Sequence, residues 1–271
     1  METPVPTPPS LTVDAPDGVA LGVFARGTGP PLVLVHGSMQ DHTVSVALED
    51  ELARDFTCYS MDRRGFGSSG DTSGYRIERE FDDVAAVVDH VAGLAGQPVH
   101  LWGHSFGASC AMGGAARTPN VGRLVLYEPS LGLSYRPGSI DEIDAAVDAG
   151  DNDTAIALVF REILGVSDSD IAAMRATPEW QGRLAVAHTV AREARAEQDW
   201  VWQPGQFDGI DAATLLLSGS DSPDELKDIT VSAAAAIPGA RVLVLDGHAH
   251  FAHRRNPAEV AAIIREFCTR S

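Results

Sequence analysis

Short apolar runs bounded by glycine or polar residues recur along the chain and predict the strands of a sheet. Residues 32–35 are apolar at four consecutive positions and end at His36-Gly37, which is typical of a strand buried on both faces of a parallel sheet. Residues 11–26 alternate loosely around Asp17-Gly18, which predicts two antiparallel strands at one edge of the sheet. Further strands are expected at residues 56–61, 99–102, 123–128, 214–218 and 241–245.

Helical spacing separates most of these runs, with helices predicted at about residues 44–54, 79–95, 108–116 and 258–267. Strands that alternate with helices imply parallel strands joined by right-handed crossovers, so the fold class is α/β with a mostly parallel, doubly wound sheet. From residue 132 to 209 the patterns are helical only, at 140–149, 154–164, 168–176 and 179–196. This block is expected to be an all-helical cap inserted before the last two strands, with residues 1–131 and 210–271 forming the core domain.

One stretch carries a candidate nucleophile. The strand predicted at residues 99–102 runs into Gly103-His104-Ser105-Phe106-Gly107, and a helical pattern of small residues follows. A strand, a sharp turn and a helix are the context of a nucleophile elbow, in which a serine sits on a strained turn with its hydroxyl exposed. Glycine is needed two residues before and two after the serine, because a Cβ there would strike the neighbouring strand or helix.

Length and composition bound the other possibilities. The 271 residues, 44% of them hydrophobic, suffice for one domain with a sizeable core and an insertion. No apolar run reaches 18 residues, so no membrane span is expected, and residues 1–9 lack the basic start and apolar core of a signal peptide. The three cysteines are an odd number without metal-ligand spacing, which predicts no metal site and is typical of a reduced cytoplasmic protein.

The charge of the chain argues against two classes of partner. A formal net charge of −18 at pH 7 disfavours nucleic acid and anionic membrane surfaces, both of which require clustered lysine and arginine. The glycine-rich segment 62–70 follows a predicted strand, but it lacks the Lys-Ser/Thr ending of a phosphate-binding loop, and no helix opens on its glycines. Nucleotide binding is therefore not expected.

Polar residues fall where the predicted strands end, which is where ligands bind in open α/β sheets. His36-Gly37, the loop at 62–65, the elbow at 103–107, the helical insertion and the late Gly-His-Ala-His-Phe at 247–251 follow one another along the chain. In this order they resemble the α/β-hydrolase superfamily over about residues 11–268, specifically its cap-bearing esterase, lactonase and haloperoxidase-like branch. The resemblance implies a serine hydrolase that needs no cofactor, and it is far less specific for the substrate.

The resemblance also implies catalytic roles. Ser105 corresponds to the nucleophile, which needs a neighbouring base to take its proton. His250 corresponds to that base, because the superfamily pattern Gly-x-Gly-His-Phe aligns with residues 247–251 only in this register. His248 and His253 compete for the role and are otherwise expected to be solvated or hydrogen-bonded loop histidines.

The acidic member of the triad has two candidates. Most of the superfamily places it after the strand that precedes the last one, typically three residues after a glycine. Here that position holds Ser222, and Asp221 comes one residue early. A minority, including certain lactonases and dehalogenases, uses a carboxylate directly after the strand that follows the elbow helix, where Glu128 stands. We favour Glu128 over Asp221.

Backbone amides are expected to stabilise the oxyanion. The candidates are the N–H of Phe106, directly after the nucleophile, and that of Ser38, with Met39 as the alternative if the turn is offset by one residue. His36 is interpreted as a structural brace of its loop.

The cap and the pocket mouth must select the substrate. Candidate apolar walls, for each of which an ordinary core position is the favoured alternative, are Met39, Phe106, Phe160, Trp180, Trp200 and Trp202. The cap carries fourteen acids and six arginines, which disfavours anionic substrates such as acyl-CoA or phosphate esters. A neutral, apolar ester or lactone of small to medium size is expected. The same residues could serve perhydrolysis, haloperoxidase chemistry or C–C bond hydrolysis, and a non-hydrolytic cyclase or binding scaffold is the alternative from another functional class. Oligomeric state is not predicted.

Overall fold

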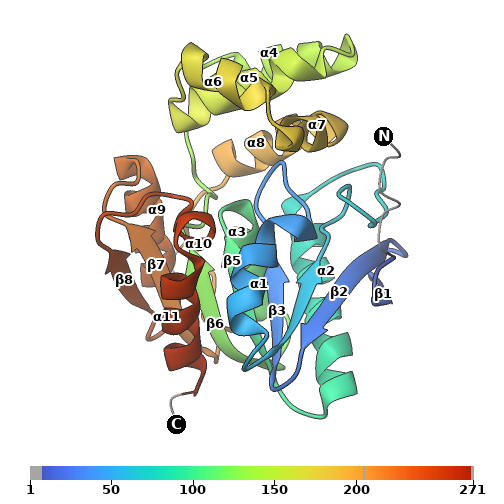
Figure 1. Cartoon of the computed structure of the whole chain (residues 1–271), viewed down its shortest axis with the longest axis vertical. Helices are drawn as coiled ribbons and strands as arrows, with labels where there is room; N and C mark the ends of the chain where they lie inside the picture. The colour runs from blue at the N-terminus through green and yellow to red at the C-terminus, as the bar shows by residue number, and fades with distance from the viewer. Residues whose placement is uncertain (1–7, 204, 270–271) are drawn as a thin grey trace.

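The computed structural model describes residues 8–203 and 205–269. These residues form a sheet with helices on both faces, and a separate helical layer lies beyond one end of the strands (Figure 1). The strand order is β1-β2-β4-β3-β5-β6-β7-β8. The strands are β1 (Leu11–Asp14), β2 (Ala20–Gly27), β3 (Pro31–Val35), β4 (Thr57–Met61), β5 (Val99–His104), β6 (Val121–Tyr127), β7 (Ala213–Gly219) and β8 (Arg241–Leu245).

Most neighbouring strands run parallel. β1 and β2 pair antiparallel around a turn in which Gly18 adopts a φ of 85°, and β2 also pairs antiparallel with β4. The pairs from β4 through β3 to β8 are parallel. The predicted α/β fold with a mostly parallel sheet and an antiparallel hairpin at its edge is confirmed.

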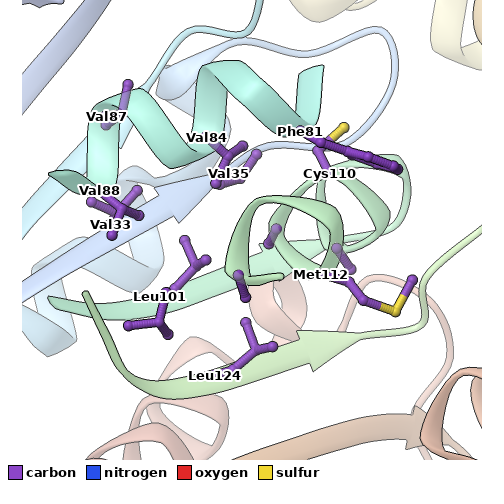
Figure 2. Packing of buried hydrophobic residues seen from close by; sticks show 14 of the residues in the cluster. Val33, Val35, Phe81, Val84, Val87, Val88, Leu101, Cys110, Met112 and Leu124 are labelled. Carbon is purple, nitrogen blue, oxygen red and sulfur yellow. The ribbon is translucent and has the colours of Figure 1, made fainter. Parts of the chain in front are cut away.

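The continuous apolar runs of the central strands arise because both faces of the sheet are covered. In β3, Val33 and Val35 pack into the core on one face, whereas Leu32 and Leu34 pack into the core on the other. α2 (Ile77–Ala95), α3 (Phe106–Ala115) and α9 (Asp224–Ala235) contribute to the first core, and α1 (Val46–Leu52) and α11 (Pro257–Thr269) to the second. Figure 2 shows the first core, where the valines of α2 lie over β3.

Two parts of the helix prediction needed correction. α9 was not predicted, although Leu226, Ile229 and Ala233 recur at helical spacing and are buried. The single helix expected at 179–196 is wrong: α7 (Pro178–Ala185) and α8 (Val190–Gln198) are separated by a 3₁₀ turn, η2 (Ala187–Thr189). The hydroxyl of Thr189 donates to the carbonyl of Val186 at 2.8 Å, which gives the chain a local alternative to the continued helix.

The segment between β6 and β7 is helical, as its sequence pattern predicted. α4 (Ser139–Asp148), α5 (Asn152–Leu164), α6 (Asp168–Arg175), α7 and α8 share an apolar core of their own, distinct from the two cores on the sheet. They lie above the upper ends of β3, β5 and β6 in Figure 1. Over the described ranges, no helix is both long and apolar enough to cross a membrane.

Two short helical segments complete the chain. A 3₁₀ turn, η1 (His42–Ser45), precedes α1, and α10 (Ala252–Arg255) lies between β8 and α11. Both lie in loops at the same end of the sheet as the cap (Figure 1). This end, where the parallel strands finish, is where the candidate site residues come together.

Candidate active site

Ser105 occupies a strained turn between β5 and α3. Its φ of 56° and ψ of −127° lie in a region that non-glycine residues rarely adopt. The flanking glycines make the turn possible, because a Cβ on Gly103 would lie 2.5 Å from the carbonyl oxygen of Gly107. A Cβ on Gly107 would lie 2.5 Å from the carbonyl oxygen of Val35. Close packing of the backbone on both sides therefore presents Ser105 at the end of the sheet.

His250 and Glu128 are joined by a hydrogen bond although 122 residues separate them. The Nδ1–H of His250 donates to Oε2 of Glu128 at 2.7 Å, and the backbone N–H of Gly219 donates to Oε1 at 2.7 Å. Glu128 is fully buried, and its φ of 45° makes it a second strained residue, directly after β6. This backbone conformation sets the direction of its side chain. With the proton on Nδ1, Nε2 of a neutral His250 is left as an acceptor.

Asp221 is placed differently. Its side chain is exposed and accepts a hydrogen bond from the hydroxyl of Ser220 at 3.0 Å, while its backbone N–H donates to the carbonyl of His248. No hydrogen bond joins it to His250 in the part of the chain that the structure describes. The carboxylate that meets His250 is thus the one at the end of β6.

The two competing histidines are also apart from Glu128. His248 pairs with Glu259 at 2.9 Å, as expected of a hydrogen-bonded loop histidine. That expectation is wrong for His253, which is buried in α10 and packs on the ring of His104 at 4.1 Å between centroids. Burial and the neighbouring His250 lower the pKa of His253 to about 3, so this ring is neutral.

Two residues that the sequence reasoning did not single out hold the His250 loop. The Nε2–H of His104 donates to the backbone carbonyl of His250 at 2.8 Å, and burial keeps its pKa well below the usual value. The hydroxyl of Tyr127 donates to the carbonyl of Ala249. The signal for His104 was its position inside the elbow motif, directly before Ser105.

The loop after β3 lies against the nucleophile. Nδ1–H of His36 donates to the carbonyl of Gly37 at 2.8 Å, and Nε2 accepts from the backbone N–H of Arg63 at 3.1 Å, so His36 braces the loop as predicted. Burial, the largest cause, and the charge of Arg63 lower the pKa of His36 to about 4. A Cβ on Gly37 would lie 3.1 Å from Cβ of Ser105, which shows how closely the loop approaches.

Ser105 and His250 line one cavity between the sheet and the cap. The space inside it, counted out to the open mouth, is about 700 Å³. Of the candidate walls, Met39 and Phe160 line it; the remaining lining residues are Gly37, Ser38, Gln40, His104, Leu133, Tyr135, Val159, Arg183, Val190, Glu193, Ala194, Glu197, Leu226 and Phe251.

The other aromatic candidates are core residues. Trp180 is buried against Phe160 within the cap, and its indole N–H donates to Asp153 at 2.8 Å. Trp200 and Trp202 pack on each other and on Phe207, away from the cavity lining. Trp180 thus belongs to the core of the cap, whereas Trp200 and Trp202 are half-buried against the core on the sheet.

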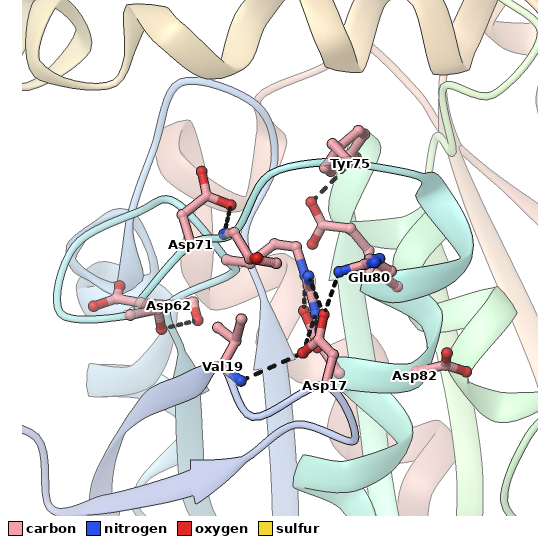
Figure 3. Close-up of polar contacts among 12 residues, drawn as sticks. Asp17, Val19, Asp62, Asp71, Tyr75, Glu80 and Asp82 are labelled. Carbon is pink, nitrogen blue, oxygen red and sulfur yellow. Dashed lines mark hydrogen bonds and ion pairs between the residues drawn. The ribbon is translucent and has the colours of Figure 1, made fainter.

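A cluster of buried charged residues, which the sequence reasoning missed, lies where the cap meets the core domain. Arg63, fully buried, pairs with Glu193 and lies 3.8 Å from Glu80. The neighbouring Glu197 accepts a hydrogen bond from the hydroxyl of Tyr135, and burial raises the pKa of this carboxyl to about 8. Figure 3 shows the polar contacts of Glu80 with Tyr75 beneath the cap.

A metal site is not evident among the described residues, since no three histidine, cysteine, aspartate or glutamate side chains are grouped as ligands. The three cysteines are buried and unpaired. Burial raises the pKa of Cys58 and of Cys268 to about 12, which keeps both thiols protonated and inert.

A strained serine beneath a helical cap, at the end of a mostly parallel sheet, defines the class of α/β-fold hydrolases. The sequence matches the alpha/beta hydrolase family over residues 32–263, and the chain belongs to this family. It is 25% identical over 241 residues to (E)-2-((N-methylformamido)methylene)succinate hydrolase from Acinetobacter baylyi, covering 88% of this chain and 89% of the relative.

Solved structures agree with this assignment. An alpha/beta hydrolase from Sphaerobacter thermophilus superposes with a TM-score of 0.84 and 32% identity, covering 96% of this chain and all of the other. The enol-lactonase from Burkholderia xenovorans has a TM-score of 0.74 at 20% identity, covering 96% of this chain and all of its own, which shows a shared fold. The protein is thus a hydrolase of the α/β fold that acts on small molecules.

Proposed function

We propose that this hydrolase cleaves a carboxylic ester or lactone through an acyl-enzyme, with Ser105 as nucleophile, His250 as general base and Glu128 as the triad acid. The observation that carries the proposal is the hydrogen bond from His250 to the buried Glu128, in a cavity that Ser105 also lines. This arrangement supplies a nucleophile, a base and an orienting carboxylate, which are the three parts of nucleophilic acyl transfer.

The reaction follows from these positions. The hydroxyl oxygen of Ser105 attacks the carbonyl carbon while Nε2 of His250 takes its proton, and Glu128 stabilises the imidazolium through Nδ1–H. The amide of Phe106, with that of Ser38 or Met39, donates to the oxyanion of the tetrahedral intermediate. His250 then returns the proton to the departing alkoxide, and water, deprotonated by the same histidine, releases the acid and restores the serine.

The cavity supports an apolar body for the substrate. Leu133, Val159 and Phe160 contribute side chains from the loop after β6 and from the cap. The expectation of a neutral substrate was derived from the net charge of the cap, and most of the charged side chains of the cap are exposed. The side chains that line the cavity are therefore the better guide to the charge of the substrate. The Acinetobacter relative is named for a succinate derivative, and a carboxylate on the substrate is compatible with this family.

The test is Ser105→Ala with p-nitrophenyl butyrate as substrate and a fluorophosphonate probe as label. The variant is expected to lose roughly a millionfold in kcat, as measured for removal of the nucleophile in another serine hydrolase, while its circular dichroism stays that of the wild type. The probe is expected to label the wild type at Ser105. Unchanged turnover in the variant, or no labelling of Ser105 in the wild type, would favour a binding scaffold instead.

A further inference from the structure

Arg183 is the exception among the arginines of the cap. Residues 132–209 contain fourteen acids and six arginines. Within the described part of this segment, every arginine except Arg183 has a carboxylate oxygen within 4.0 Å. These five arginines make seven ion pairs: Arg136 with Glu142 and Glu162, Arg161 with Asp168, Arg175 with Asp153, Arg192 with Asp71, and Arg195 with Asp141 and Asp144. In so acidic a segment, an arginine without such a partner is unexpected.

The unpaired guanidinium is also the one that faces the candidate active site. Arg183 is half-buried on α7 and lines the cavity that Ser105 and His250 line. Its guanidinium lies over the ring of Phe160, 5.0 Å from the centroid, which stabilises and orients the cation without neutralising it. A partly desolvated charge of this kind is costly unless a ligand supplies the counter-charge.

The surroundings of Arg183 do not supply that counter-charge. Glu179, one turn earlier on α7, is exposed and lies beyond ion-pair distance. The adjoining groove is lined by a second cation, Arg254 of α10, and by Asp41, Asp50 and Glu179, none of which lies within ion-pair distance of Arg183. Burial, together with Arg254, lowers the pKa of Arg183. An arginine keeps its proton at neutral pH, so Arg183 stays a cation in the cavity wall.

We propose that Arg183 binds a carboxylate group carried by the substrate, apart from the ester or lactone carbonyl that Ser105 attacks. The planar guanidinium can donate two parallel hydrogen bonds to a carboxylate, and its contact with Phe160 sets the plane of that fork. This inference rests on the proposed function and specifies its substrate class. It replaces the neutral substrate expected from the total charge of the cap.

Two acidic side chains also line the cavity. Glu193 and Glu197 line the same cavity from α8 and are buried, and one oxygen of Glu193 has no hydrogen-bond partner among the described residues. Glu193 is paired with the buried Arg63, and the raised pKa of Glu197 keeps its carboxyl mostly protonated at neutral pH, so neither acid neutralises Arg183. Arg183 is the one arginine or lysine among the described residues that line the cavity, so the preferred substrate carries one carboxylate, as in the half-ester of a dicarboxylic acid.

The kinetic test compares matched esters that differ in one end group. The p-nitrophenyl half-esters of adipic, pimelic and suberic acid are paired with p-nitrophenyl hexanoate, heptanoate and octanoate. Sodium 5-acetoxypentanoate is paired with pentyl acetate to place the carboxylate in the alcohol part. For the best pair, the ratio of kcat/KM for the carboxylate ester to kcat/KM for the methyl-ended ester is expected to fall roughly ten- to a hundredfold in Arg183→Met.

Two control variants separate the effect of the two parallel hydrogen bonds from the effect of the positive charge. Arg183→Lys, which keeps the charge but loses the two-pronged geometry, is expected to give an intermediate ratio. Arg161→Met removes an equal charge from the cap outside the cavity, and the wild-type ratio is expected. The proposal is overturned if Arg183→Met keeps the wild-type ratio for every pair, or if Arg161→Met lowers it as much.

An equilibrium measurement keeps the carboxylate site testable independently of turnover. Monomethyl adipate is titrated by calorimetry into the Ser105→Ala protein and into Ser105→Ala/Arg183→Met. Binding that weakens at least tenfold in the double variant supports the carboxylate site. This holds even if the wild type hydrolyses no ester, a result that would contradict only the proposed function. Equal or absent binding in both proteins overturns the carboxylate site even where Ser105-dependent hydrolysis is observed.

Discussion

Replacing Glu128 by glutamine tests whether this carboxylate orients the catalytic base. In the wild type, its two oxygens accept from Nδ1–H of His250 and from the backbone N–H of Gly219, each at 2.7 Å. Glutamine has one oxygen and one NH₂ group, so it can accept only one of these donors well. The backbone N–H of Gly219 cannot change, whereas an imidazole can move its proton, so the oxygen is expected to face Gly219 and the NH₂ group to face Nδ1.

The consequence is the wrong tautomer of the base. With Nδ1 forced to accept, the proton of His250 moves to Nε2, which can no longer take the proton of Ser105. The corresponding acid-to-amide change in a well-studied serine protease lowers kcat by about 10⁴. We expect a similar loss here, equivalent to about 5.5 kcal/mol in the activation free energy. Initial rates with p-nitrophenyl butyrate measure it, and urea unfolding confirms that the variant is folded.

The matched control is Asp221→Asn. Asp221 is exposed and bonded to Ser220, so its replacement is expected to change kcat less than about threefold. The reasoning fails if Glu128→Gln stays within tenfold of the wild type. It also fails if Asp221→Asn loses more activity than Glu128→Gln, because the carboxylate after β7 would then be the functional partner of His250.

Two further predictions concern the fold around the site. Gly107→Ala places a Cβ 2.5 Å from the carbonyl oxygen of Val35, so we expect the free energy of unfolding to fall by roughly 4 kcal/mol or more. Urea titrations measure this loss. An unfolding curve close to that of the wild type would show that the turn around Ser105 can relax. Burial raises the pKa of Glu197 from 4.5 to about 8. Between pH 4.5 and pH 8 the folded state therefore binds a proton that the unfolded state has lost, so the free energy of unfolding falls as the pH rises through this range. Relative to Glu197→Gln, the wild type should lose up to about 4 kcal/mol of unfolding free energy between pH 5 and pH 8. A difference that does not change with pH would contradict the assignment.

The local sequence pattern was enough to predict those strands and turns whose conformation depends on neighbouring residues. The apolar run at 32–35 predicted a strand covered on both faces, and the two cores on the sheet show this directly. The Gly103–Gly107 motif predicted the strained turn, because only a sequence with glycine at both positions lets the backbones approach so closely. α9 was missed although its helical spacing was present, so that error lay in the interpretation of the pattern.

The partner of His250 was beyond the reach of the sequence alone. Glu128 and Asp221 each follow a strand of the same sheet, and either loop could have carried a carboxylate to the imidazole. The backbone at the end of β6 turns through a positive φ at Glu128, which buries the carboxylate, whereas the turn after β7 leaves Asp221 in solvent. Side-chain direction after a strand depends on one or two backbone angles, and those are set by packing against distant segments.

The charge inside the cavity was decided in the same way. Composition shows an acidic cap, but it does not show that Arg183 lines the cavity without an ion pair among the described residues, or that the buried Glu193 and Glu197 line the same cavity. The sequence by itself determined the fold class and the serine turn, because sterics within a few residues dictate both. The tertiary structure decided which carboxylate bonds to His250, which side chains line the cavity and where the local charges lie, because these depend on contacts between side chains far apart in the chain.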